Sequence, residues 1–315
     1  MTIEQRAHPV VVGVDGTAEA IDAARWAAGL AMWHGQPLHL VYALSGVDEA
    51  LLILTSAQQE DAGEYPRHIG QAVLDRAADA VHAEYPTLHV KQTLSHRSPT
   101  DALLEHGSHA RLIVLACADV SAGGALLVGS TTLSVATRAT CPVVAWRGNA
   151  LAPNDLPVIV GVDEGRVSDT ALLTAFELAD CLGVGLTAVN AVSPRREVGD
   201  VDLPILLDWS ALEDEARQRL RTVVDPIAAR WPGVRVSHVV EVGKASRVLL
   251  GRAFGAQLVV VGSRGRGGVA SALLGSTGLS LLHHSPTPVV ICPSARAEEP
   301  TSSQAQRSGA AAAAH

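Results

Sequence analysis

One segment pattern occurs twice in this chain of 315 residues, and the repeat limits the possible folds more than any other feature. The run Pro9–Asp15 (P-V-V-V-G-V-D) returns almost unchanged as Pro157–Asp163 (P-V-I-V-G-V-D). Two later pairs match in the same order: Gly129–Thr131 with Gly275–Thr277, and Pro142–Val144 with Pro288–Val290. The first pair lies 148 residues apart and the later pairs lie 146 residues apart, so the two copies are almost equal in length. We therefore predict a tandem duplication of one domain of about 140 residues.

The repeat also predicts the domain boundaries. Residues 1–147 would form the first domain, 148–156 a linker, and 157–293 the second domain. Residues 294–315 are polar and then rich in alanine, so we expect a disordered tail without a function of its own.

Strands and helices are expected to alternate through each half. In the first half the apolar patterns predict strands at 9–14, 38–43, 88–94, 112–117 and 143–146, and helices at 17–34, 69–84, 98–109 and 129–138. The segment 45–66 is expected to be irregular. Hydrophobic residues make up 48% of the chain but aromatic residues only 3%, so the cores must consist of Ala, Val and Leu. This composition and alternation predict an α/β fold: two tandem, doubly wound, five-stranded parallel sheets of the Rossmann-like type, each with strand order 3-2-1-4-5.

The most unusual local feature is a glycine-rich stretch, Gly262–Thr277, which directly follows the buried run Leu258–Val261. Its glycines allow tight turns and a close approach of the backbone to a ligand. Arg264 and Arg266 add positive charge, and Gly275-Ser276-Thr277 would begin a helix whose N-terminus favours an anion. The stretch is neither a P-loop nor a G-x-G-x-x-G motif. We interpret it as a phosphate-binding loop; the alternative is a surface turn without a ligand.

Strand order predicts where a ligand would bind. In a doubly wound sheet the crevice lies at the carboxyl ends of the strands where the winding direction reverses, here between the first and fourth strands. Asp163 ends the first strand of the second half and Gly262 ends the fourth, so both should border this crevice. Asp163 could bind a ribose hydroxyl or a divalent cation, or it could only cap the following helix. The end of the second strand, 187–190, would line the side of the base.

Charge and composition exclude several functions. The net charge of −8 argues against general nucleic-acid binding. There is no apolar run of roughly 18 residues and no apolar leader, so we expect a cytoplasmic protein that does not contact membranes. The four cysteines are far apart, which is typical of free, mostly buried thiols. No metal-ligand spacing or Ser-His-Asp set is evident, and the pair His283-His284 is more consistent with a helix end.

These residues resemble the universal stress protein family in its tandem actinobacterial form. The resemblance covers about 8–147 and 157–293 and is carried by V-V-V-G-V-D-G-T, V-I-V-G-V-D and the spacing G-x2-G-x9-G-[ST] that starts at Gly262. It implies an adenine nucleotide alpha hydrolase-like fold and binding of ATP or another adenine nucleotide such as cAMP, with or without Mg²⁺. It also implies pairing of domains through their last strands, in a homodimer or in a pseudo-dimer within one chain. The implied ligand-binding residues are Asp163, Val189, Gly262, Arg264, Gly265, Arg266, Gly275, Ser276 and Thr277.

The first half departs from this pattern. Ala116 and Asp119 replace Gly262 and Gly265, and Ala118 and Val120 replace the two arginines. A negative charge beside a triphosphate is unfavourable unless a metal ion intervenes. The residues that remain are Asp15, Val41, Gly129, Ser130 and Thr131. We therefore expect a competent site in the second half and a weak or empty site in the first.

Three functions remain open from the sequence. The first is a nucleotide-binding regulatory protein of stress or dormancy. The second is a slow ATP hydrolase or nucleotidyl transferase, although no general base is evident and Lys244 is the only lysine of the second half. The third is a dimerising scaffold whose loops are vestigial, which suits the first half better than the second.

Overall fold

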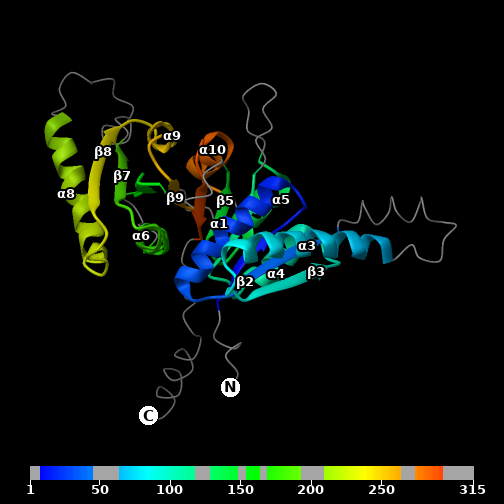
Figure 1. Cartoon of the computed structure of the whole chain (residues 1–315). Coiled ribbons are helices and arrows are strands. Elements are labelled where there is room, and N and C mark those ends of the chain that lie inside the picture. The colour runs from blue at the N-terminus through cyan, green and yellow to red at the C-terminus, as the bar shows by residue number, and fades with distance from the viewer. Residues whose placement is uncertain are drawn as a thin grey trace, which may run out of the picture.

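The computed structural model describes residues 8–44, 64–117, 128–147, 154–163, 169–192, 209–263 and 274–293 (Figure 1). The predicted apolar patch Leu51–Leu54, the linker core at 148–153 and the tail lie outside the described residues. So does most of the glycine-rich stretch, 264–273, which includes Arg264, Gly265 and Arg266.

Strands and helices of the first half follow the predicted alternation. The strands are β1 Val10–Gly13, β2 Leu38–Ala43, β3 Val90–Ser95, β4 Leu112–Ala116 and β5 Val143–Trp146. The helices are α1 Ala18–His34, α3 Glu64–Glu84, α4 Pro99–Gly107 and α5 Ser130–Arg138. The largest difference from expectation is at α3, which begins at Glu64 instead of residue 69. The apolar stripe used to predict this helix starts later than the helix itself.

The second half repeats the same elements. Its strands are β6 Val158–Gly161, β7 Leu186–Val192, β8 Val236–Val242, β9 Leu258–Gly262 and β10 Val289–Cys292. Its helices are α6 Asp169–Leu182, α8 Trp209–Ala228, α9 Ala245–Ala253 and α10 Ser276–His284.

All ten strands form a single sheet with the order β3-β2-β1-β4-β5-β10-β9-β6-β7-β8. Within each half the order is the predicted 3-2-1-4-5, and the pairs are parallel. The expectation of two separate sheets is corrected, because β5 and β10 pair antiparallel through Val143–Ala145 and Val289–Ile291. We call this β5·β10 pairing the seam. It is the pairing through last strands that was expected for a pseudo-dimer within one chain.

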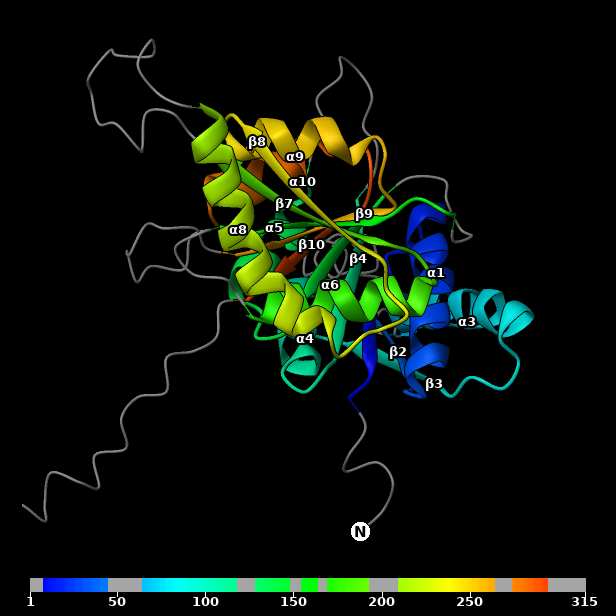
Figure 2. The same cartoon turned by 90° about the vertical axis from the view of Figure 1, so that its left-hand side faces the viewer.

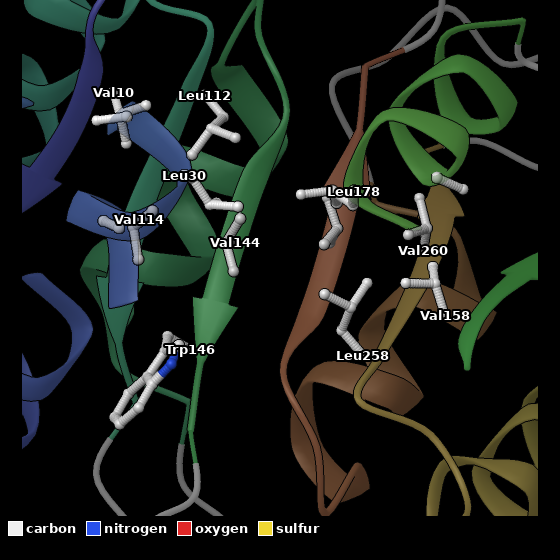
Figure 3. Packing of buried hydrophobic residues seen from close by; sticks show 14 of the residues in the cluster. Val10, Leu30, Leu112, Val114, Val144, Trp146, Val158, Leu178, Leu258 and Val260 are labelled. Atoms are coloured by element: carbon white, nitrogen blue, oxygen red, sulfur yellow. The ribbon is translucent and has the colours of Figure 1, made fainter. Parts of the chain in front are cut away.

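Two layers of helices cover the sheet, one on each face (Figure 2). The core on one face joins Val10 and Val12 to α1, α3, α6 and α8, while the core on the other face joins Val11 to α4, α5, α9 and α10. Because both faces are covered, the inner strands such as β1, β4, β6 and β9 are continuous apolar runs, while the edge strands β3 and β8 carry polar residues. Each core runs across the seam: in Figure 3 the labelled side chains come from both halves, with Val144 and Trp146 on β5 and Val158 and Val260 on β6 and β9.

Small side chains explain the close packing of α1 on the sheet. Seven residues of α1 are buried, and six of them are alanines. The N-cap of the helix is Thr17, whose Oγ1 accepts a hydrogen bond from the Ala20 N–H at 3.2 Å, and its C-cap is Gly35 in the left-handed conformation (φ 61°). None of the helices in the described ranges combines the length and apolar character needed to cross a bilayer.

Candidate functional site

Strands β6 and β9 are neighbours, and their carboxyl ends form the centre of the expected crevice in the second half. Val158 pairs with Leu258 and Val160 with Val260, so the two strands end at the same height. Asp163 and Gly262 therefore lie at one edge of the sheet, although 99 residues separate them in sequence. The inference that the crevice lies between the first and fourth strands agrees with this topology.

Backbone hydrogen bonds fix both ends of the glycine-rich stretch. The Ser263 N–H donates to the Cys292 carbonyl at 2.7 Å, which extends the β9·β10 pairing by one residue. The Gly275 N–H donates to the Ser263 carbonyl at 2.8 Å, which brings the start of α10 against the end of β9. We call the Gly275–Ser263 bond the loop clamp. Its consequence is that Gly262, Ser263 and the first turn of α10 lie together at the crevice.

The first turn of α10 is suited to an anion. Its N-cap is Gly275 (φ −60°, ψ 152°), and within the described residues no side chain caps the first N–H groups. By contrast, Thr17 and Ser98 cap α1 and α4 through their hydroxyl oxygens. Uncapped N–H groups at the positive end of the helix dipole favour a negatively charged ligand. Ser276 is exposed and Thr277 is half-buried at this end.

The φ of Gly275 also shows what the glycine is needed for. A value of −60° is open to every residue, so backbone strain does not require glycine there. The absence of a side chain instead leaves room beside the first turn of α10.

Strand β7 lines the next side of the crevice, where the sequence predicted a base contact at Val189. The Val189 side chain is buried, and its carbonyl already accepts a hydrogen bond from the Val162 N–H at 2.9 Å. Alternate residues of a parallel strand direct their backbone groups to the same neighbour, so the backbone of Ala191 faces the same way as that of Val189. Since β6 ends at Gly161, which pairs with Val189, no residue of β6 pairs with Ala191.

Asn190 is a residue of this region that the sequence analysis did not single out. It is only 3% exposed, and its Nδ2 donates to the Val162 carbonyl at 2.9 Å. This bond ties the end of β7 to the segment that leads to Asp163. Asn190 lies in the stretch 187–190 that was expected to line the side of the base, and an amide near the end of a mostly apolar strand is the signal that could have identified it.

The corresponding aspartate of the first half shows how such a residue can be used locally. Asp15 Oδ1 accepts hydrogen bonds from the Thr17 N–H at 3.0 Å and from the Thr17 hydroxyl at 2.6 Å. Asp15 therefore shapes the turn before α1, while Thr17 is the residue that caps the helix. Asp163 itself is half-buried at the end of β6.

A cavity of about 270 Å³ lies at the carboxyl edge of the first half. It brings together three of the residues predicted for that site, Asp15, Val41 and Thr131. Gly129 and Ser130 lie beside it at the start of α5, which again has no side-chain cap. The other lining residues are Gly13, Val14, Ala20, Tyr42, Ala43, Pro99, Leu103, Leu115, Ala116 and Thr132.

The two halves differ at the loop clamp. Cys117 occupies the position of Ser263, and its N–H donates to the Trp146 carbonyl at 2.8 Å, as in the second half. However, among the described residues no hydrogen bond joins the Gly129 N–H to the Cys117 carbonyl. The Cys117 thiol instead contacts the Thr132 hydroxyl at 3.9 Å. The start of α5 is therefore not tied to the end of β4 in the way that α10 is tied to β9.

Three of the four cysteines do not provide a reactive group. All four are free, and burial is the main cause that raises the pKa of Cys141, Cys181 and Cys292 to about 12. A thiol with such a pKa stays protonated near neutral pH and is a poor nucleophile. In the part of the chain that the structure describes, no three His, Cys, Asp or Glu side chains are grouped so that they could hold a metal ion.

Fold and crevices together define a class: α/β proteins made of two doubly wound halves, each with an uncapped helix N-terminus at the carboxyl edge of its strands. Comparison with known families places the chain within this class. The pattern of the universal stress protein family matches residues 7–147 and 156–293, and the chain belongs to that family.

Individual relatives match this chain over nearly their whole length. A universal stress protein of Mycobacterium tuberculosis H37Rv is 36% identical over 299 residues, which cover 92% of this chain and 99% of that protein. One from Mycolicibacterium smegmatis is 33% identical over 292 residues, covering 90% and 96%. Among solved structures, a universal stress protein from Archaeoglobus fulgidus has a TM-score of 0.68 at 19% identity, covering 91% of this chain and 99% of that one. This last likeness supports the fold alone.

Proposed function

We propose that the chain is an adenine-nucleotide-binding regulatory protein, with its principal site in the second half. The observation that carries the proposal is the loop clamp, which holds an uncapped helix N-terminus beside the ends of β6 and β9. In this proposal the phosphates bind at Gly275, Ser276 and Thr277, and Arg264 and Arg266 contribute positive charge from the adjoining loop. Gly262 and Gly265 let the backbone approach them.

The sugar and the base would lie toward β6 and β7. Asp163 at the end of β6 is placed to accept a hydrogen bond from a ribose hydroxyl, or to bind Mg²⁺ together with the phosphates. We place the base beside the backbone of Ala191 instead of Val189, because the Val189 carbonyl is already engaged by Val162. The cavity of the first half is compatible with this placement, since Ala43 and Val41, which correspond to Ala191 and Val189, both line it.

For the first half we propose weaker nucleotide binding. The cavity and the uncapped start of α5 are compatible with a ligand there. However, the sequence lacks the two arginines and has Asp119 in the neighbouring loop, so the local charge disfavours a triphosphate. A regulatory role in stress or dormancy, and the cytoplasmic location expected from the sequence, belong to the same proposal.

Gly275→Val tests the site directly. A branched side chain at the N-cap would occupy the space beside the first N–H groups of α10, so the affinity for Mg·ATP should fall by about tenfold or more. Isothermal titration calorimetry with ATP, and separately with cAMP, would measure it. Gly129→Val is the matched control, since a Cβ at Gly129 meets nothing within 4 Å and the second site is untouched.

Other outcomes have clear meanings. Two equal, tight ATP sites in the unmodified protein would contradict the proposed difference between the halves. Unchanged affinity in Gly275→Val would contradict the assignment of the loop. Native mass spectrometry of the purified protein would identify any retained nucleotide and its stoichiometry, and a phosphate-release assay would detect slow hydrolysis.

A further inference from the structure

We propose that Arg147, a residue of the first half, positions the phosphate-binding helix α10 of the second half. Arg147 directly follows β5, next to Trp146 at the strand end shown in Figure 3. This inference extends the proposed function, since it adds a residue outside the crevice on which the second site depends.

The contacts of Arg147 cross the seam. Its Nη1 donates to the Ser285 carbonyl at 3.1 Å, and its Nη2 donates to the Leu282 carbonyl. Leu282 lies in the last turn of α10, and Ser285 is its C-cap. The guanidinium of one half therefore binds the carbonyl groups at the C-terminus of a helix in the other half.

Burial makes these contacts important for the position of α10. Arg147 is 3% exposed and Ser285 is fully buried. Among the described residues Arg147 has no carboxylate partner and its Nε is buried without a hydrogen bond, so the negative end of the α10 dipole is what offsets the buried charge. A displacement of this helix end would leave a buried guanidinium without partners, which is strongly unfavourable.

The other end of α10 is the proposed phosphate site. The helix has nine residues and is about 13 Å long, so a displacement of one end would be passed on to the other. Arg147 holds its C-terminus, and the loop clamp holds its N-terminus. We therefore expect Arg147 to determine how well the first N–H groups of α10 are placed for an anion.

Arg147 has no counterpart in the second half. The residue that corresponds to Arg147 in the second half is Pro293, which follows β10 and carries neither a charge nor an N–H group. The end of α5 therefore has no equivalent support across the seam. In addition, the Cys117 N–H donates to the Trp146 carbonyl, which connects the residue before Arg147 with the end of β4 at the first-half cavity.

Arg147→Met tests the proposal in the full-length protein. The affinity of the second site for Mg·ATP should fall by roughly three- to tenfold, because the variant removes the charge at the helix end while keeping an apolar side chain. Calorimetry well below the unfolding temperature would measure it, with stoichiometry as a check of folding. Arg147→Lys keeps the charge and should restore part of the affinity. Arg138→Met is the matched control, because Arg138 is an exposed residue in the last turn of α5.

A second measurement does not need a ligand. Amide hydrogen exchange at Gly275 and Leu279, whose N–H groups donate to the Ser263 and Gly275 carbonyls, should become faster in Arg147→Met, and in Arg147→Lys to a lesser degree, than in the unmodified protein. A purely structural role would lower the unfolding temperature without changing either readout in the folded protein. Unchanged affinity and unchanged exchange would overturn the proposal for Arg147. If the unmodified protein does not bind ATP at all, the proposed function fails, and the exchange experiment still decides the role of Arg147.

Discussion

Three glycines show that the same residue type has different roles in this molecule. Gly16, in the turn after Asp15, has a φ of 89°, and an added Cβ would lie 3.1 Å from Val73 Cγ2. Gly35 ends α1 with a φ of 61° in open space. Gly251 lies inside α9 and is exposed, also in open space. Only the first two positions require the conformational freedom of glycine.

A pair of alanine substitutions follows from this difference. Gly251→Ala should raise the free energy of unfolding by about 0.5–1 kcal/mol, because alanine has the higher helix propensity and meets no neighbour. Gly35→Ala should lower it by about 1 kcal/mol, because the left-handed conformation is unfavourable for a residue with a Cβ. Chemical denaturation of both variants measures the two changes. Changes of the same sign would contradict the argument.

At the scale of elements, β2 and α4 meet through a pair of histidines. His39 on β2 is 4% exposed, its Nε2 lies 2.8 Å from the Thr93 hydroxyl, and its ring centroid is 4.7 Å from that of His106 on α4. Burial, then His106 and then Lys91 on β3 lower the pKa of His39 to about 4. Burial also lowers the pKa of His106, with Glu105 opposing and Lys91 adding to the effect.

Acid should therefore weaken this contact. The neutral form of His39 is favoured in the folded state, so its contribution to stability is complete above pH 6.5 and is lost as the pH falls toward 4. Between pH 8 and pH 5 the loss from His39 should be about 2 kcal/mol. In His39→Gln the side chain stays neutral, so the dependence on pH should be smaller. Denaturant unfolding at both pH values measures this, and an unchanged dependence in the variant would contradict it.

Elements and their order could be predicted from the sequence, but some contacts between them could not. The runs Val10–Gly13 and Leu258–Gly262 are apolar without interruption, and such runs predict buried parallel strands directly. The position of Asp163 beside Gly262 then followed from the strand order. By contrast, the engaged carbonyl of Val189 depends on the register between β6 and β7, and the loop clamp depends on where α10 begins. Neither is encoded in a local pattern.

In the described residues the whole molecule has one sheet instead of the two that the repeat predicted, and the β5·β10 pairing that joins them was implied only by the family resemblance. Val144 and Val290 face each other in this pairing, and both are fully buried. An ion pair also connects the two halves. Arg111 of the first half contacts Glu177 of α6 at 3.0 Å, and the Nε of Arg111 donates to His34 Nε2 at 3.1 Å. Arg111 and Glu177 are partly exposed, so the burial of apolar side chains contributes more than this ion pair to holding the two halves together.

A shared core predicts that both halves unfold together. Differential scanning calorimetry of the unmodified protein should show one transition, because both apolar clusters contain residues of the two halves. Val290→Asp places a charge in the middle of the seam and should cost at least about 3 kcal/mol, separating the transition into two. Val242→Asp, on the 40% exposed end of edge strand β8, is the control and should keep a single transition. Two transitions in the unmodified protein would show that the halves are independent.

The antiparallel direction of the seam has a consequence for how the protein can be recognised. Strands of the two halves point in opposite directions, so their carboxyl ends lie on opposite rims of the sheet. A partner protein that docks on one rim meets only one of the two crevices, and no single ligand can span both. A structural change at one rim can therefore influence the other rim only through the interior of the protein. Elements such as α10, which extend from rim to rim, would transmit it.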